Sequence, residues 1–189
     1  PYKLDSRGFY MAKICVFTGS SDVDGIFRET ARDIGILIGS RGHELIYGGS
    51  DFGLMGEVSR NVKEYNAKIT EIIPELWQKE TNKKNNVIVT KDFAQRKKKM
   101  IEISDAFITI PGGIGTIDEF FEVMVEKQIY SCKKPNVLVN TESFYDPLLA
   151  QIAHMKNKGF FNCIRKSPEK LYQEVSNPIE AIKYIEGNL

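Results

Sequence analysis

Short apolar runs alternate with longer amphipathic segments along this chain. These short apolar runs predict strands at residues 13–18, 44–48, 69–74, 86–90, 106–111 and 136–140. Apolar residues at helical spacing predict helices at about 25–40, 54–65, 93–104 and 116–130, followed by a mainly helical remainder. Such alternation requires right-handed crossovers between parallel strands. We therefore expect an α/β fold, a doubly wound and mostly parallel sheet with helices on both faces.

Size and charge narrow the class of protein. The length of 189 residues favours a single domain, for which we take residues 11–189. Residues 1–10 are interpreted as a leader or an expression remnant, because Met11-Ala12 resembles a natural start. Lys and Arg number 26 against 25 Asp and Glu, so the formal net charge of +1 predicts no general affinity for nucleic acid or membranes.

Neither a membrane span nor a disulfide framework is indicated. No apolar run approaches the ~20 residues that cross a bilayer, and the amino end lacks the order of a secretory signal. Three widely spaced cysteines match no metal-ligand pattern: Cys15, Cys132 and Cys163. We therefore expect a cytoplasmic protein. The lysine- and asparagine-rich stretch 79–86 is the expected mobile surface loop.

Three glycine clusters follow predicted strands and precede predicted helices. They are Gly19-Ser20-Ser21, Gly48-Gly49-Ser50 and Pro111-Gly112-Gly113-Ile114-Gly115-Thr116. Ligands bind beyond the carboxyl ends of parallel strands, and helix N-termini attract anions, so the clusters predict a phosphate pocket. The alternative is that each cluster only makes a tight turn. Neither Walker A nor G-x-G-x-x-G spacing is present, which disfavours ATP and nicotinamide dinucleotides.

Arg96 is the most informative charged residue. On its helix it shares a face, which we expect to point inward, with Phe93, Met100 and Ser104. An inward guanidinium is costly unless an anion meets it. Two interpretations are open: an internal salt bridge, or a bound phosphate or catalytic carboxylate beside the ligand. Lys97 shares part of this face but can extend to solvent, as Lys98 and Lys99 are expected to do.

Glu119 also has two open roles. In the first, Thr116-x-x-Glu119 is a capping box whose glutamate bonds back to the helix start. In the second, Glu119 lies one turn beyond the glycine cluster, where it polarises a water or binds ribose hydroxyls. Glu122 would add a second carboxylate of the kind that stabilises a sugar cation. Both face away from the expected core stripe of Ile117, Phe120, Phe121, Met124 and Val125.

Other side chains give weaker signals. His43 and His154 lack metal-ligand spacing, so no metal site is expected, and His43 is interpreted as a surface or turn residue. Trp77 and Tyr130 are interpreted as core or interface residues rather than as platforms that stack a base.

Residues 111–119, PGGIGTIDE, fit the pattern P-G-G-x-G-T-x-x-E. This pattern resembles the signature of the Lonely Guy family of cytokinin riboside 5′-monophosphate phosphoribohydrolases, many of them labelled possible lysine decarboxylases. Arg96-Lys97 with Met100 is similar to the R-K-x-x-M segment of that family. Tyr47-Gly48-Gly49 with Gly53-Leu54-Met55-Gly56 is similar to its Y-G-G-G-x-x-G-L-M-G segment. Shorter similarities, at Gly19-Ser20-Ser21 and Lys134-Pro135, extend the resemblance over about residues 13–140.

The resemblance implies a Rossmann-like fold, usually a homodimer, that binds AMP-like nucleotides without a metal or cofactor. It implies Arg96 and Glu119 as the catalytic pair. The residues expected to contact substrate or phosphate are Gly19, Ser20, Gly48, Gly49, Lys97, Met100, Pro111, Gly112, Gly113, Gly115, Thr116 and Glu122. The sequence departs from the family pattern at two positions. Ser50 replaces the third glycine of Y-G-G-G, so we expect the backbone there to approach the ligand less closely. Glu126 stands at the tryptophan of a W-x-Q sequence, which favours plain AMP over a prenylated base.

We hypothesise that the protein hydrolyses the N-glycosidic bond of nucleoside 5′-monophosphates, giving the free base and ribose 5-phosphate. The main alternative is a non-catalytic carrier of nucleotide or molybdenum cofactor on the same fold, which would not need Arg96 and Glu119. A single-stranded DNA binder would need a positive excess that is absent here. Lysine decarboxylation would need a Schiff-base lysine that the sequence does not single out.

Overall fold

A parallel sheet forms the centre of the molecule. The computed structural model describes residues 3–4, 10–80, 85–130, 132–161 and 167–189. Seven strands pair in the order β6-β5-β4-β3-β7-β8-β9, and every pairing is parallel. The strands are β3 (Lys13–Phe17), β4 (Glu44–Tyr47), β5 (Ile69–Pro74), β6 (Asn86–Thr90), β7 (Ala106–Thr109), β8 (Asn136–Val139) and β9 (Gln173–Val175). All the strands predicted from sequence are present.

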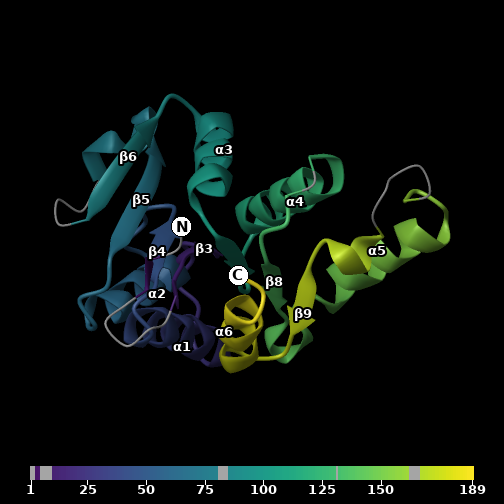
Figure 1. Ribbon diagram of the computed structural model, residues 1–189, viewed down its shortest axis with the longest axis horizontal. Helices are drawn as coiled ribbons and strands as arrows, with labels where there is room; N and C mark the ends of the chain where they lie inside the picture. Colours follow the sequence, from purple (N-terminus) through teal and green to yellow (C-terminus); the bar gives the residue numbers. More distant parts are fainter. Residues whose placement is uncertain (1–2, 5–9, 81–84, 131, 162–166) are drawn as a thin grey trace.

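Helices cover both faces of this sheet (Figure 1). They are α1 (Ile26–Ser40), α2 (Gly53–Lys63), α3 (Phe93–Ile103), α4 (Ile114–Ile129), α5 (Asp146–Asn157) and α6 (Pro178–Glu186). Apolar side chains of α1, α2 and α6 share one buried cluster, whereas those of α3 and α4 share another. A third cluster joins α4 to α5.

Side-chain alternation along β3 produces this layering. Ile14 and Val16 lie in the cluster beneath α1 and α2, whereas Cys15 and Phe17 lie in the cluster beneath α3 and α4. Successive side chains of a strand point to opposite faces, so a strand that is apolar at every position is buried on both sides. The predicted doubly wound fold is confirmed.

The direction of the strand order reverses between β3 and β7. From β3 the chain proceeds outward through β4, β5 and β6, then returns to the other side of β3 for β7, β8 and β9. Loops that leave β3 and β7 therefore diverge over opposite faces and open a crevice between them. Gly19 follows β3 and Gly112 follows β7, so two of the three glycine clusters lie at this crevice.

Some local expectations differ from the structure. The segment expected to be mainly helical contains β9 at the sheet edge, where its partly or fully exposed side chains leave no apolar run to reveal it. His43 is 1% exposed rather than at the surface. Its Nδ1 accepts a hydrogen bond from the Ala12 N–H at 3.2 Å, and its Nε2 lies 3.3 Å from Glu186 Oε1. These two partners satisfy the buried imidazole.

The expected leader and surface loop are only partly described. The short strands β1 (Lys3–Leu4) and β2 (Tyr10–Met11) pair antiparallel, so β2 spans the expected boundary after residue 10. Of the stretch 79–86, residues 81–84 lie outside the described residues, and the 3-10 helix η1 (Glu75–Glu80) precedes them. Among the helices that the structure describes, none is long and apolar enough to cross a membrane.

Candidate active site at the sheet switch point

A cavity of about 270 Å³ lies at the carboxyl ends of β3 and β7, and we call it the switch cavity. The two glycine turns, α3 and α4 supply most of its lining, with one residue each from α2 and η1. The lining residues are Thr18, Gly19, Ser20, Ser21, Met55, Trp77, Phe93, Arg96, Lys97, Gly113, Gly115, Thr116, Asp118 and Glu119. The structure therefore brings Arg96 and Glu119 together with the first and third glycine clusters.

Arg96 and Glu119 form a buried ion pair on the cavity wall. Arg96 Nη1 donates to Glu119 Oε1 at 2.7 Å, and the two residues are 6% and 9% exposed. Arg96 Nε donates to the Ile72 carbonyl at 2.9 Å, which fixes the plane of the guanidinium. The internal salt bridge considered from sequence is thus present, and its partner is the carboxylate of the glycine-rich signature.

Helix α3 directs Arg96 inward. Its N-cap residue Asp92 accepts a hydrogen bond from the Gln95 N–H at 2.8 Å, which fixes the helix start. Met100 and Ser104 are 1% exposed, as the helical face predicts. Phe93 does not follow this pattern: it is 45% exposed and lines the cavity. Met100 lies in the core cluster and is not among the lining residues.

The capping interpretation of Glu119 is wrong. Helix α4 begins at Ile114 with Gly113 as its N-cap, so Thr116 is already inside the first turn and Glu119 lies in the second. No side chain among the described residues caps this helix start. Its free backbone N–H groups and positive dipole end lie where Gly113, Gly115 and Thr116 line the cavity, an arrangement that favours an anion.

Burial raises the pKa of Glu119. Desolvation raises the pKa of its carboxyl above the ordinary value, while the charge and hydrogen bond of Arg96 oppose the rise. A carboxyl whose pKa moves toward the working pH is better matched to proton transfer than an exposed one. The pair is therefore suited to hold a substrate and to accept a proton.

Lys97 lines the cavity, but its ammonium group is paired with two carboxylates. Its Nζ lies 2.9 Å from both Asp118 Oδ1 and Glu122 Oε2. Partial burial lowers the pKa of Lys97, but these two acceptors outweigh that effect and raise it. A Schiff-base lysine must lose its proton, so Lys97 is poorly suited to that chemistry. Glu122 pairs with Lys97 and is not among the residues that line the cavity.

Two glycines are required by their neighbours. A Cβ atom on Gly48 would lie 2.2 Å from Arg96 Nη2, and one on Gly112 would lie 2.2 Å from Thr116 Oγ1. Both distances are far below van der Waals contact, so the guanidinium and the α4 turn occupy the space that larger residues would need. The turns after β3 and β7 are also joined directly, because Thr18 Oγ1 donates to the Pro111 carbonyl at 2.8 Å.

A second cavity of about 610 Å³, here the side cavity, adjoins the switch cavity. It is lined by Ser20, Gly48, Gly49, Ser50, Asp51, Phe52, Met55, Ile73 and Trp77. Ser20, Met55 and Trp77 line both cavities, so the two are neighbours separated only by these side chains. Trp77 is 40% exposed here, so of the two roles expected from sequence, core or interface, the core role is wrong. Its place directly after β5, at the carboxyl edge of the sheet, is the signal that could have revealed it.

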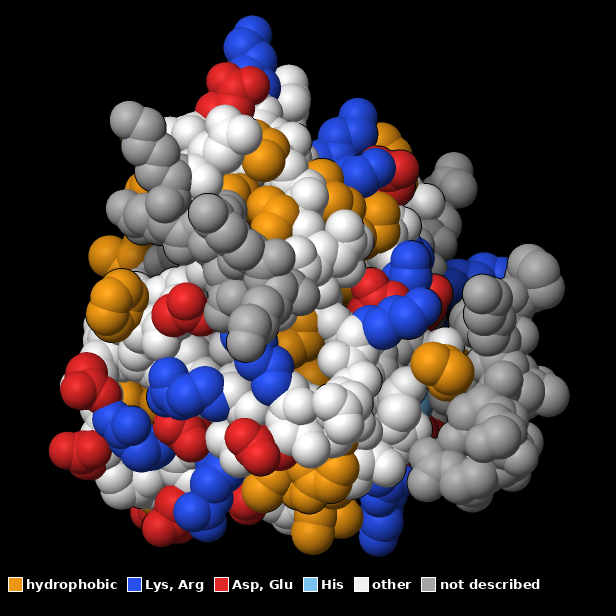
Figure 2. All heavy atoms as spheres, turned by 90° about the vertical axis from the view of Figure 1, so that its left-hand side faces the viewer, with side chains coloured by type: hydrophobic (Ala, Val, Ile, Leu, Met, Phe, Trp, Pro, Cys, Tyr) orange, Lys and Arg blue, Asp and Glu red, His pale blue; other side chains and the backbone are white. Residues whose placement is uncertain are grey.

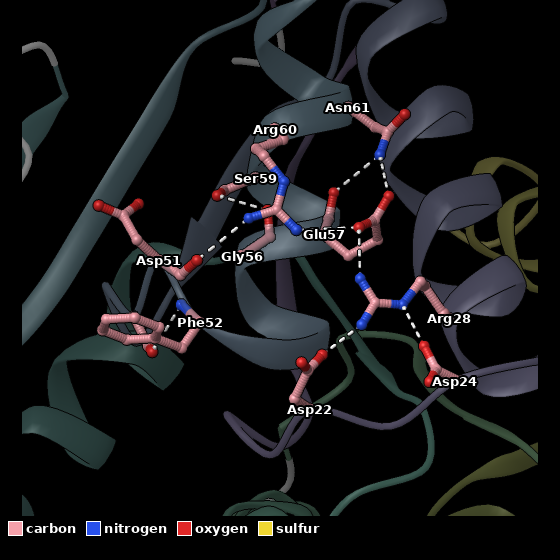
Figure 3. Close-up of polar contacts among 11 residues, drawn as sticks. Asp22, Asp24, Arg28, Asp51, Phe52, Gly56, Glu57, Ser59, Arg60 and Asn61 are labelled. Atoms are coloured by element: carbon pink, nitrogen blue, oxygen red, sulfur yellow. Dashed lines mark hydrogen bonds and ion pairs between the residues drawn. The ribbon is translucent and has the colours of Figure 1, made fainter.

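An ion-pair network holds the loops around these cavities (Figure 3). Arg28 of α1 contacts Asp22 and Asp24 in the loop after β3, and its Nη1 lies 3.6 Å from Glu57 of α2. Glu57 also pairs with Arg60 at 2.9 Å, and Arg60 donates to the Asp51 carbonyl at 3.1 Å. Glu57 therefore links the loop that contains Ser20 to the loop that contains Asp51.

The surface and composition of the described residues add two observations. On the face seen in Figure 2, Lys and Arg side chains are interspersed with Asp and Glu and form no continuous basic track. Among the residues that the structure describes, no group of three or more His, Cys, Asp and Glu could hold a metal ion.

The fold and the site define a Rossmann-like α/β protein with an anion-accepting helix start and a buried Arg–Glu pair at the switch point. The family model described as possible lysine decarboxylase matches residues 55–185, and the chain belongs to this family. A rice (Oryza sativa subsp. japonica) protein named probable cytokinin riboside 5′-monophosphate phosphoribohydrolase LOGL2 is 35% identical over 92% of this chain and 72% of its own length. The cytokinin riboside 5′-monophosphate phosphoribohydrolase of Rhodococcoides fascians is 32% identical over 90% of this chain and 88% of its own length.

Among solved structures, the molybdenum cofactor binding protein of Rippkaea orientalis has a TM-score of 0.72. It is 21% identical and the match covers 94% of this chain and 96% of that protein. At this level of identity the likeness shows the shared fold alone.

Proposed function

We propose that this protein hydrolyses the N-glycosidic bond of a nucleoside 5′-monophosphate, releasing the free base and ribose 5-phosphate. The observation that carries the proposal is the buried Arg96–Glu119 pair on a cavity wall next to the uncapped start of α4. The names of the similar rice and Rhodococcoides proteins support the same reaction.

The reaction uses water and groups of this chain. The phosphate binds the N–H groups at the start of α4, and Arg96 neutralises charge and orients the nucleotide. The bond between C1′ and the base nitrogen breaks, and its electron pair leaves with the base. The ionised Glu119 stabilises the positive charge that develops on the ribose and accepts a proton as water bonds to C1′. The departing base gains one proton from solvent, which balances the step.

A Glu119→Gln variant tests this assignment. The amide keeps the size of the side chain and an acceptor for Arg96, so the variant should fold and bind AMP. It should lose most of its turnover, since general-base help is worth about 10²–10⁴ in rate. Chromatography of adenine released from AMP measures this, with isopentenyladenosine monophosphate run in parallel to identify the preferred base.

The outcomes separate hydrolase from carrier. Unaltered turnover in Glu119→Gln would remove Glu119 from the mechanism. Binding of AMP by the wild-type protein without release of adenine would favour the carrier hypothesis instead.

We further propose that the protein acts as a homodimer in the cytoplasm. Helix α4 and the residue after it expose apolar side chains on one side: Val125, Ile129 and Tyr130 are 45%, 61% and 71% exposed. Exposed apolar side chains that cluster in this way are typical of protein–protein interfaces. Light scattering of the wild-type protein and of Ile129→Asp tests the dimer, which the introduced charge should dissociate.

A further inference from the structure

Trp77 occupies the boundary between the two cavities. It lies in η1, directly after β5, and lines both the switch cavity and the side cavity. The Phe93 ring lies edge to face against the indole, with centroids 5.0 Å apart and planes at 84°. Because 40% of Trp77 stays exposed despite this contact, a large aromatic surface faces the open site. Tryptophan is usually more deeply buried than this.

The two cavities differ in chemistry. The switch cavity contains the start of α4, whose backbone N–H groups attract anions, together with Arg96 and Lys97, each of which is paired with a carboxylate. Among the described residues, no cationic side chain lines the side cavity. Asp51 is its one charged lining residue there, and the larger lining side chains are mostly apolar: Phe52, Met55, Ile73 and Trp77. An anion is therefore favoured in the first cavity and a planar, uncharged group in the second.

A nucleoside monophosphate has the matching arrangement of groups, since its phosphate and its base lie at opposite ends of the ribose. We propose that the side cavity is the base subsite and that Trp77 stacks on the base. This inference rests on the proposed function, which places the phosphate at α4. Stacking area grows with ring size, so Trp77 selects purine over pyrimidine nucleotides.

Trp77 is the only tryptophan in the chain, so its fluorescence reports on this subsite alone. AMP should quench the emission of the wild-type protein at once on mixing, whereas ribose 5-phosphate should bind without quenching. Calorimetry supplies the dissociation constants. Glu119→Gln is used as the background for AMP and CMP so that neither nucleotide is consumed.

In this background, Trp77→Ala should raise the Kd for AMP about tenfold or more, because stacking on an aromatic side chain contributes that much per base. The Kd for CMP should rise less, and that for ribose 5-phosphate should stay within about twofold. Trp77→Phe should recover most of the loss. Leu76→Ala is the matched control, since Leu76 is 79% exposed in the same 3-10 helix and lines neither cavity.

An unchanged Kd for AMP in Trp77→Ala would overturn the inference. An equal rise for AMP and ribose 5-phosphate would also overturn it, because that pattern indicates a structural role. These results are independent of turnover. If AMP quenches Trp77 and Trp77→Ala weakens AMP selectively, but no adenine is released, the hydrolase proposal fails and the subsite stands. If adenine is released but AMP neither quenches Trp77 nor loses affinity selectively in Trp77→Ala, the hydrolase proposal stands and the base subsite is refuted.

Discussion

Replacing Gly48 with alanine should disable the Arg96–Glu119 pair although neither residue of the pair is substituted. The new methyl carbon would lie 2.2 Å from Arg96 Nη2, whereas ordinary contacts begin near 3.4 Å, so the guanidinium must move by about 1.2 Å. The 2.7 Å hydrogen bond from Nη1 of the same guanidinium to Glu119 lengthens by up to that amount, to about 3.9 Å at most, which is beyond hydrogen-bond distance. Gly48 does not have a positive φ, so the backbone itself accepts alanine.

The expected loss is about 100-fold in kcat/KM for AMP, or ~2.7 kcal/mol, because a misplacement of about 1 Å costs that much. Release of adenine, followed by chromatography, measures the loss. Circular dichroism during heating checks that the variant is folded, since overpacking also costs about 1–3 kcal/mol of stability. Gly187→Ala, at the end of α6, is the control, because its Cβ would meet no atom closer than 3.4 Å.

A double-mutant cycle makes the test decisive. In an Arg96→Ala background the methyl group at position 48 has room, so adding Gly48→Ala should change kcat/KM less than threefold. Full additivity of the two losses would show that Gly48 acts elsewhere. Wild-type kcat/KM in a folded Gly48→Ala variant would refute the argument that the position of Arg96 matters.

Two further predictions concern charge. Burial raises the pKa of Glu119 above its ordinary value, so kcat/KM should fall as the pH drops through that raised pKa and Glu119 becomes protonated. Arg96→Met removes the cation that opposes the rise, so the acid limb of the pH–rate profile should move to higher pH. An acid limb at the wild-type pH in this variant would contradict the prediction. Glu57→Gln breaks the link between Arg28 and Arg60 and should raise the KM for AMP up to about fivefold with kcat unchanged, since partly exposed pairs contribute ~0.2–1 kcal/mol. The surface variant Glu64→Gln should leave both constants alone, and equal effects of the two variants would disprove the role of the network.

The order of secondary structure was predictable because each buried strand is a short apolar run with few alternatives. The strand β9 is not predicted from the sequence, because an edge strand of three partly or fully exposed residues has no apolar periodicity. His43 was misplaced because its two hydrogen-bond partners come from residues 31 and 143 positions away. A local sequence pattern predicts contacts between residues that are close along the chain, whereas these two contacts join residues that are far apart in the sequence.

The same limit applied to Trp77 and Phe93. An apolar aromatic is normally a core or interface residue, so the sequence predicts Phe93 on the inward face of its helix and Trp77 in the core or an interface. Both instead follow strands β5 and β6 at the carboxyl edge of the sheet, where the topology leaves side chains at the mouth of a cavity. Their positions are predicted by the strand end that each residue follows, and not by hydrophobicity.

Glu119 is the residue at which local and tertiary reasoning conflict. Locally, Thr116-x-x-Glu119 has the spacing of a capping box, yet the helix begins two residues before Thr116, so Thr116 is not its N-cap and no side chain of such a box bonds to the helix start. The start of α4 therefore remains available to an anion, and the carboxylate turns to Arg96 instead. Gly48 leaves the space through which that guanidinium reaches it. Three sequence features that are separate along the chain, a glycine turn, an inward arginine and a signature glutamate, thus depend on one another at a single point of the fold.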